Sequence, residues 1–183
     1  MKKRYITANE LLQDAFRLGL EVLQSGFRPD LIVGVWRGGT PVAIAVQEIF
    51  QVCGIETEHM AIRTASYRGI AERERTVQVM GMDCLLQLTQ PRHRVLLVDD
   101  VFDTGLSLRA IIQSLQSRVA DCDIRLATPW YKPANNQAGF EPHYFLHETV
   151  DWLVFPHELD GLSAAEISRY KPEVRALLDE YGL

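Results

Sequence analysis

Two short and continuous apolar runs most constrain how this chain can fold. Residues 31–35 and 94–98 are apolar at almost every position, which is typical of strands buried on both faces of a parallel sheet. Each run is followed by a helical pattern, with Val42, Val46 and Ile49 after the first and residues 104–118 after the second. Buried strands that alternate with amphipathic helices predict an α/β fold with a mostly parallel sheet flanked by helices.

Weaker patterns extend this reading to both ends of the chain. Thr7 and Glu10 form a capping box before an N-terminal helix, and Thr40 with Pro41 suits the start of the next helix. Ser163 with Glu166 predicts a short helix near the C-terminus, and Pro172 predicts the start of another. Further strands are expected at 58–63, 123–128 and 152–155, and the polar residues 64–76 read as a loop.

The expected organisation is one domain over residues 1–183. Residues 1–129 would form the core, and 130–160, rich in aromatic residues, prolines and histidines, would form a small hood lobe at one end of the sheet. Residues 161–183 would form a helical tail.

Composition narrows the possible classes of protein. The formal net charge of −5, from 19 Lys and Arg against 24 Asp and Glu, disfavours a protein that coats nucleic acid. No apolar run reaches the length of a membrane span, and no apolar stretch follows the basic N-terminus as in a signal peptide. The scattered residues Cys53, Cys84 and Cys122 indicate reduced thiols and a cytoplasmic location.

Residues 95–107 carry the clearest chemical signal in the sequence. A buried strand ends in Asp99 and Asp100, and a short loop with Thr104, Gly105 and Ser107 leads into a helix. Ligands of open α/β sheets bind beyond the carboxyl ends of the strands, and the N-terminus of a helix favours a phosphate. Adjacent carboxylates accept hydrogen bonds from vicinal hydroxyls or approach a metal. This pattern therefore suits a sugar phosphate.

The same segment resembles the phosphoribosyl pyrophosphate (PRPP) signature of the type I phosphoribosyltransferases, and only Phe102 departs from it, where a smaller aliphatic residue is usual. The resemblance implies that Asp99 and Asp100 hold the ribose hydroxyls of PRPP. It further implies that the 5′-phosphate binds to the loop residues Asp103, Thr104, Gly105, Leu106 and Ser107. In the 6-oxopurine branch of this family, which the chain resembles most, the acid at Asp103 is the proposed catalytic base near purine N7.

Other segments resemble further parts of the same family. Residues 34–39 resemble its pyrophosphate loop, which implies a pyrophosphate-binding role for Trp36, Arg37 and Gly38 and in which the peptide between the first two is often cis. Ser66 and Tyr67 resemble the pair that the purine enzymes carry in a flexible loop, which closes over the site and excludes water.

The resemblance also implies how the purine and the metal are held. Lys132 would donate to the 6-oxo oxygen, Trp152 would stack on the base, and the backbone of Leu153 would read its 2-position. The cofactor would be Mg²⁺, with Asp99, Asp100 and Glu158 as the acidic residues near it. The role of His157, where relatives carry Trp or Asp, stays open.

The resemblance to this family implies that the chain acts in purine salvage. A 6-oxopurine (hypoxanthine, guanine or xanthine) would react with PRPP to give the nucleoside 5′-monophosphate and pyrophosphate, and the chain would form a homodimer or homotetramer. One alternative is the same fold acting on adenine or uracil. Another is a regulator of this fold that binds PRPP, a nucleotide or RNA, although the negative net charge and the intact Asp103 disfavour it.

Overall fold

The computed structural model describes residues 2–68 and 75–183. These residues form two compact units, one made of Leu12–Val150 and the other of Met1–Leu11 together with Asp151–Leu183. The two ends of the chain thus belong to one unit. The expected boundaries at 129 and 160 differ from this division, because residues 130–150 group with the main sheet.

The larger unit is built on a mostly parallel sheet, as the apolar runs predict. The strand order is β4-β3-β2-β5-β7-β6, and β8 also pairs with β7. Every pairing is parallel except that between β3 and β4. The strands are β2 (Leu31–Trp36), β3 (Glu58–Arg68), β4 (Arg75–Met80), β5 (Arg94–Val98), β6 (Val101–Phe102), β7 (Asp123–Tyr131) and β8 (Tyr144–Glu148).

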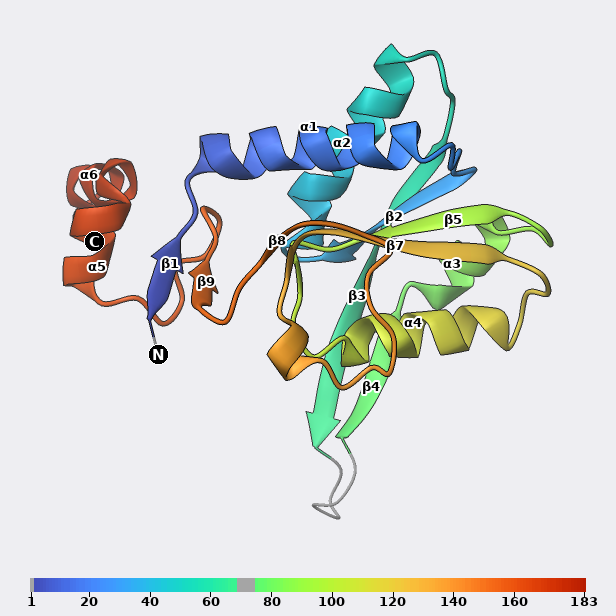
Figure 1. Cartoon of the computed structure of the whole chain (residues 1–183). Helices are drawn as coiled ribbons and strands as arrows, with labels where there is room; N and C mark the ends of the chain where they lie inside the picture. Colours follow the sequence, from blue (N-terminus) through green and yellow to red (C-terminus); the bar gives the residue numbers. More distant parts are fainter. Residues whose placement is uncertain (1, 69–74) are drawn as a thin grey trace. The chain divides into compact units, whose positions relative to one another are not determined.

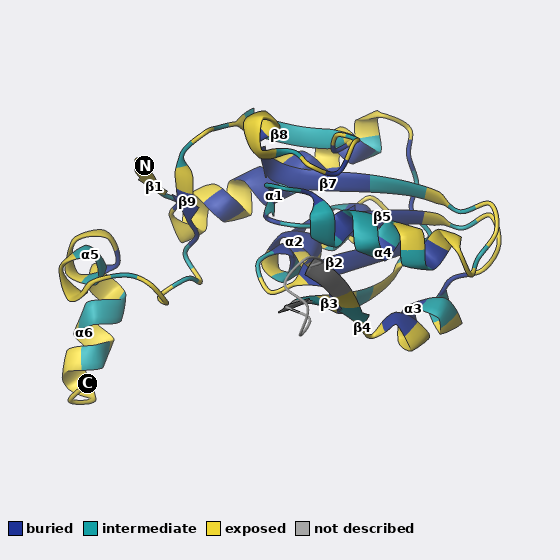
Figure 2. Ribbon diagram, turned by 90° about the horizontal axis from the view of Figure 1, so that it is seen from below, coloured by how far each residue is buried: buried dark blue, intermediate teal, exposed yellow. Residues whose placement is uncertain are grey.

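Helices cover both faces of this sheet (Figure 1). One face carries α1 (Ala8–Gln24) and α2 (Gly39–Val52), and the other carries α3 (Met82–Leu88) and α4 (Leu106–Gln116). Helices α1 and α2 approach closely, because a Cβ atom on Gly19 would lie only 3.1 Å from the Cβ of Ile49. The central strands are buried over most of their length, and they appear largely dark blue between the helices in Figure 2. This packing gives the ends of β2 and β5 a rigid support.

Two local expectations about this unit are wrong. Strand β3 continues to Arg68 and pairs in antiparallel fashion with β4, so residues 64–68 and 75–76 belong to strands rather than to a loop. Residues 69–74 of that expected loop lie outside the described residues. Helix α2 begins at Gly39 without a side-chain cap, and the buried hydroxyl of Thr40 has no hydrogen-bond partner among the described residues.

The smaller unit joins the two ends of the chain. Strand β1 (Lys3–Tyr5), which the sequence analysis missed, pairs in parallel with β9 (Trp152–Val154). Helices α5 (Ala164–Tyr170) and α6 (Pro172–Glu180) follow. The capping box of Ser163 and Glu166 is present, and α6 begins at Pro172, as predicted.

Two further expectations can be compared with the fold. Within the described ranges, no helix is both long and apolar enough to cross a membrane. The thiols of Cys53, Cys84 and Cys122 are free.

The backbone at Gly105 generates a stability prediction. Gly105 has φ +71°, and an added Cβ would lie 2.4 Å from the Phe102 ring and 2.7 Å from the Cβ of Ala138. Gly105→Ala should therefore lower the free energy of unfolding by about 3 kcal/mol, which combines left-handed strain with overpacking. Urea denaturation measures this change.

Gly139 is the matched control, because it has φ +82° but nothing within 4 Å of an added Cβ. Gly139→Ala should lower the free energy of unfolding by only about 1 kcal/mol, from strain alone. Equal losses in the two variants would show that the crowding around Gly105 is unimportant.

Candidate active site

Two predicted motifs meet where β2 and β5 end side by side. Asp99 and Asp100 follow β5, and the glycines of the loop after β2 lie directly against them. A Cβ on Gly38 would lie 1.7 Å from Oδ2 of Asp100, and one on Gly39 would lie 2.5 Å from the carbonyl oxygen of Val98. Only glycine allows this approach. Residues about 60 positions apart in the sequence therefore form one surface at the carboxyl edge of the sheet.

The acidic pair is held in an environment that disfavours its charge. Burial raises the pKa of Asp99 well above its usual range, and the adjacent Asp100 carboxylate raises it further. The backbone N–H of Asp100 donates to Oδ1 of Asp99 at 3.0 Å, which opposes the shift only in part. Such a pair is stabilised by a cation or by hydroxyl donors, so its chemistry fits both Mg²⁺ and a diol.

The loop after the acidic pair is fixed by aromatic packing. Phe102 is fully buried and meets Tyr131 and Phe140 edge to face, with ring centroids 5.4 and 5.9 Å away. Phe102 also packs under Gly105, which precedes the first residue of α4. The unusual aromatic residue in the motif thus supports the loop. The half-buried hydroxyls of Thr104 and Ser107 lie at this helix N-terminus, where backbone N–H groups favour an anion.

Asp103 is held by two donors that come from the segment after β7. Nζ of Lys132 donates to one carboxylate oxygen at 3.0 Å, and the side-chain amide of Asn135 donates to the other at 2.6 Å. Lys132 is buried, with 6% of its surface exposed, whereas the side chain of Asp103 is 40% exposed. The structure thus brings Asp103 and Lys132 together, which the sequence motifs alone do not show.

Asn135 is a site residue that the sequence analysis missed. It lies in the short 3₁₀ helix Pro133–Asn135, directly after Lys132. The one signal in the sequence is its place three residues after a lysine that the family resemblance had singled out. Asparagine is common in turns, so its residue type is uninformative there.

Trp36 and Arg37 lie at the start of the loop after β2. Trp36 ends this strand with 51% of its surface exposed, and the peptide between the two residues is cis. Trp36 also lines a hollow of about 480 Å³ with Arg63, Met80 and Gly81. Arg37 is exposed beside the glycines, so its guanidinium can reach an anion bound there.

Comparison with known proteins identifies this arrangement. The sequence pattern of the phosphoribosyl transferase domain matches residues 3–160. The chain belongs to this family. A hypoxanthine-guanine phosphoribosyltransferase of Lactococcus lactis is 25% identical over 182 residues, which cover 95% of the chain and 93% of that protein. One of Staphylococcus epidermidis is 27% identical over 154 residues, covering 84% and 80%.

A solved structure agrees with these matches. The crystal structure of a purine phosphoribosyltransferase from Pyrococcus horikoshii superposes with a TM-score of 0.71 at 28% identity, covering 89% of the chain and 99% of that protein. The expected type I phosphoribosyltransferase fold is thereby confirmed.

Ser66 and Tyr67, the predicted lid residues of this family, lie on β3. Their register partners on β4 are Val77 and Thr76. The backbone at these two positions is therefore paired strand rather than loop.

Of the predicted base-contacting residues of this family member, Lys132 lies in the larger unit, whereas Trp152 and Leu153 lie in the smaller one. Trp152 is 54% exposed and begins β9, and Leu153 follows it. Trp152 and Val154 bond to β1, through Trp152 N–H to Lys2 at 2.9 Å and through Ile6 N–H to Val154 at 2.9 Å. Because backbone groups alternate along a strand, those of Leu153 face the opposite edge, where the described residues supply no further strand.

Glu158 also lies in the smaller unit, and its carboxylate has a partner there. Its Oε2 accepts the backbone N–H of Phe155 at 3.0 Å. The described residues hold no cluster of three or more His, Cys, Asp or Glu side chains that could bind a metal. The expected roles of Asp99, Asp100 and Glu158 near Mg²⁺ stay predictions.

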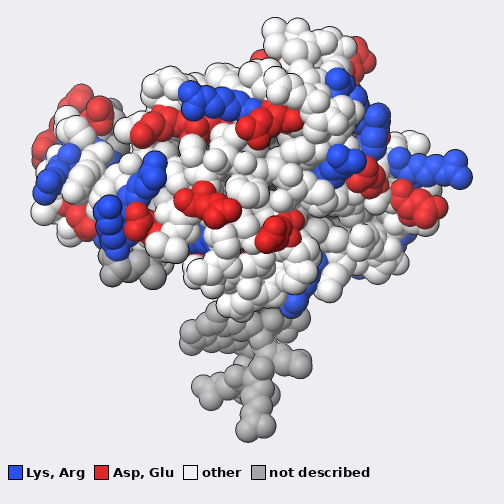
Figure 3. Space-filling model, viewed as in Figure 1, with Lys and Arg blue, Asp and Glu red and all other residues white. Residues whose placement is uncertain are grey.

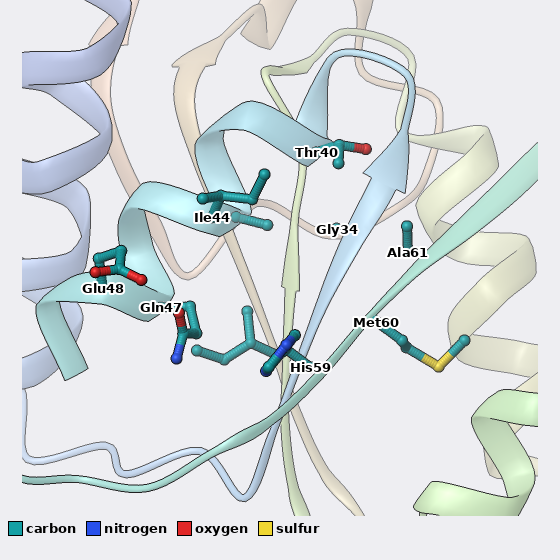
Figure 4. Close-up of a pocket in the computed structure, with 10 residues that line it drawn as sticks. Gly34, Thr40, Ile44, Gln47, Glu48, His59, Met60 and Ala61 are labelled. Carbon is teal, nitrogen blue, oxygen red and sulfur yellow. The ribbon is translucent and has the colours of Figure 1, made fainter. Parts of the chain in front are cut away.

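A separate cavity of about 360 Å³ lies between α2 and the strands β2 and β3 (Figure 4). Thr40, Ile44, Gln47, Glu48, His59 and Met60 are among its lining residues. None of the predicted site residues lines it. This cavity is thus distinct from the acidic edge where Asp99 and Asp100 lie.

The raised pKa of Asp99 generates a prediction about stability. The native state holds this proton more tightly than the unfolded chain, whose Asp has a pKa of about 3.9. Stability therefore falls as the pH rises from that value through the native pKa. Asp99→Asn should raise Tm at pH 7.5 without Mg²⁺ by roughly 2–4 °C, the shift that corresponds to about 1 kcal/mol in a chain of this size. Thermal unfolding at pH 4 and 7.5 measures it.

Asp30 supplies a control of opposite sign. Hydrogen bonds from Arg94 lower the pKa of Asp30, so its contribution to stability is present at neutral pH and is lost as the pH falls. Asp30→Asn should therefore lower Tm at pH 7.5. A lower Tm for Asp99→Asn as well would contradict the charge repulsion inferred for the acidic pair.

Proposed function

We propose that the chain is a purine phosphoribosyltransferase. It transfers the phosphoribosyl group of PRPP to a 6-oxopurine and releases pyrophosphate, as a step of purine salvage. One observation carries the proposal, namely that the Asp99–Asp100 pair lies against Gly38 while Asp103, three residues on, is ion-paired with Lys132. The similar proteins are hypoxanthine-guanine and purine phosphoribosyltransferases, which supports this substrate class.

The proposed PRPP site uses the edge where β2 and β5 end. Asp99 and Asp100 accept hydrogen bonds from the ribose hydroxyls. Donors for the 5′-phosphate come from the loop residues Asp103, Thr104, Gly105, Leu106 and Ser107, through backbone N–H groups and hydroxyls. The loop residues Trp36, Arg37 and Gly38 hold the pyrophosphate. The close contact of Gly38 with Asp100 supports this assignment, because the loop after β2 lies against the residues that follow β5.

Asp99 and Asp100 would also hold the cofactor Mg²⁺, either directly or through water, with Glu158 as the further acidic residue in this proposal. When bound, Mg²⁺ would neutralise charge on the phosphate oxygens of PRPP and of the departing pyrophosphate. Arg37 and the loop N–H groups act on the same pyrophosphate leaving group. Electrostatic stabilisation of its developing charge is the main contribution to catalysis in this proposal.

Asp103 and Lys132 suit the two neighbouring polar atoms of a 6-oxopurine. N7 and O6 lie on the same side of the purine, and the ion pair presents an acceptor and a donor 3.0 Å apart. Asp103 takes the N7 proton as N9 attacks C1′ and the C1′–O bond to pyrophosphate breaks. The ammonium of Lys132 has three donors, so it can bind O6 while it holds Asp103. The 6-amino group of adenine carries hydrogens there and would leave this buried donor poorly matched.

The smaller unit supplies the remaining contacts to the base in this proposal. The exposed ring of Trp152 offers a stacking surface, and the outward N–H and C=O of Leu153 can read the 2-position. Ser66 and Tyr67 would help exclude water from the reacting sugar. The role of His157, whose ring stacks on Phe155 with centroids 5.7 Å apart, is to hold the turn after β9.

The surface does not favour the RNA-binding alternative. On the face that Figure 3 shows, blue Lys and Arg side chains lie among red Asp and Glu side chains rather than in a continuous basic stripe. A stripe of that kind is the usual footprint of a nucleic-acid site. The proposal also includes a cytoplasmic location. It further includes assembly into a homodimer or homotetramer, and sedimentation velocity measures this oligomeric state.

The substrate class is tested by initial rates with a panel of bases. At fixed PRPP and Mg²⁺, hypoxanthine, guanine or xanthine should be used at least about 100-fold more efficiently than adenine or uracil, since Lys132 matches a 6-oxo oxygen. EDTA should abolish turnover. Preference for adenine or uracil would move the chain to another branch of the family. Undetectable turnover with every base, together with nanomolar RNA binding, would favour a regulator.

Asp103→Asn tests the proposed base. The amide keeps the shape of the side chain but cannot take the N7 proton, so kcat should fall about 100- to 10,000-fold. The Kd of PRPP should change by less than about threefold, since the loop N–H groups remain.

Asn135→Ala is the matched control, because it removes one hydrogen bond to Asp103 but keeps the carboxylate. Its kcat should fall by no more than about tenfold, the equivalent of one hydrogen bond. Equal kcat in wild type and Asp103→Asn would discard Asp103 as the base.

A further inference from the structure

The last 23 residues of the chain lie beyond the family match, which ends at residue 160. They include α5 with seven residues and α6 with nine. Helices this short are marginal in water by themselves, so their stability must come from contacts with the rest of their unit. We call residues 161–183 the tail.

The first contact of the tail is with β1. The ring of Tyr170 stacks on Tyr5, with centroids 3.7 Å apart and planes 10° apart. Glu166 accepts hydrogen bonds from the hydroxyl of Tyr5 at 2.8 Å and from the ammonium of Lys3. Hydrogen bonds from Lys3, from the backbone N–H of Ser163 and from Tyr5 lower the pKa of Glu166 to about 2, so the carboxylate is ionised at neutral pH. Because β1 pairs with β9, the tail is tied to the strand that carries Trp152 and Leu153.

The second contact reaches the proposed base-contacting segment itself. Lys171, between α5 and α6, is 7% exposed, and its Nζ donates to the carbonyl oxygens of Phe155 at 2.7 Å and Pro156 at 3.0 Å. Burial lowers the pKa of Lys171, and the Glu158 carboxylate opposes this shift. A buried ammonium is costly unless it is hydrogen-bonded, so these two carbonyls must stay in place beneath it.

The turn after β9 is thus held from two directions. Glu158 binds the N–H of Phe155, and Lys171 binds the C=O of the same residue and that of the next. The turn follows Val154, the last residue of the strand that carries Trp152 and Leu153, so these bonds fix the backbone at the end of that strand. A lysine that belongs to no family motif therefore makes the contacts that set the backbone of the proposed base platform.

We propose that the tail is a positioning element for the purine, and that Lys171 is its central positioning residue. Lys171 acts through the backbone of Phe155 and Pro156 and does not touch the substrate. This inference rests on the proposed function, because it assumes that Trp152 and Leu153 contact the base. A tail that only stabilised the fold would lower Tm and leave substrate affinities alone.

Steady-state kinetics of the full chain separate these roles, at a temperature where each variant is folded by near-UV circular dichroism. Lys171→Met removes both hydrogen bonds and keeps the aliphatic stem. The KM for the purine should rise about tenfold, while the KM for PRPP should stay within about twofold. Lys171→Arg keeps a cationic donor and should restore the purine KM to within about threefold of wild type.

Arg175→Met is the matched control. Arg175 is a cation of the same tail, and its side-chain partners, Asp179 and the carbonyl of Leu183, both belong to the tail rather than to the turn after β9. Both KM values should match those of wild type in this variant. If Lys171→Met proves unfolded, Tyr170→Leu loosens α5 from Tyr5 with Lys171 intact, and it should raise the purine KM about threefold.

Trp152→Ala separates failure of this inference from failure of the proposed function. A raised purine KM in Trp152→Ala but not in Lys171→Met or Tyr170→Leu would overturn the positioning role and leave the function standing. Parallel rises in both KM values for Lys171→Met would also overturn it. A wild-type chain that transfers phosphoribose to no purine would overturn the function and this inference together.

Discussion

The approach of Gly38 and Gly39 to the Asp99–Asp100 pair is the constraint on which the rest of the site depends. A side chain at either glycine would collide with Asp100 or with the end of β5. The contact therefore requires the two strands to be neighbours in the parallel sheet, with their carboxyl ends level. It also brings together the buried Asp100 and the half-buried Asp99, whose charges repel, an arrangement that the apolar core on both faces of the sheet must stabilise. The stability of the rest of the fold thus maintains an otherwise unfavourable acidic surface, which suits a polyhydroxylated anion and its cation.

The fold was largely predictable because its signals are local. The apolar runs that became β2 and β5 and the capping boxes at Thr7 and Ser163 each depend on a few neighbouring residues. Strand β1 was not predictable, since Lys3–Tyr5 is polar and forms a strand only because β9, about 150 residues later, pairs with it. The extent of β3 was misjudged for a similar reason. Its last residues, 64–68, lack the continuous apolar pattern of a buried strand, and antiparallel pairing with β4 makes them part of the sheet.

The candidate site follows the same division. The acidic pair and the loop up to Ser107 are contiguous in the chain, so the whole motif can be recognised from the sequence. Asn135 could not be found in that way, because its value lies in a 2.6 Å contact with a residue 32 positions earlier. Lys132 was expected to face only the purine, and its ion pair with Asp103 adds a second partner. Long-range polar contacts leave no periodicity, and this is the part of the chemistry that required coordinates.

The pairing of β1 with β9 also has a consequence for how the protein is made. Residues 12–150 contain every strand of the main sheet, so a nascent chain can build that sheet while the rest is still being synthesised. The smaller unit must wait, because residues 3–5 have no partner until residues 152–154 leave the ribosome. The edge that suits PRPP, together with Asp103 and Lys132, can therefore form first, and the strand that carries Trp152 and Leu153 is completed last. Newly made chains would pass through a stage that holds the proposed sugar-phosphate site but lacks the stacking surface of Trp152.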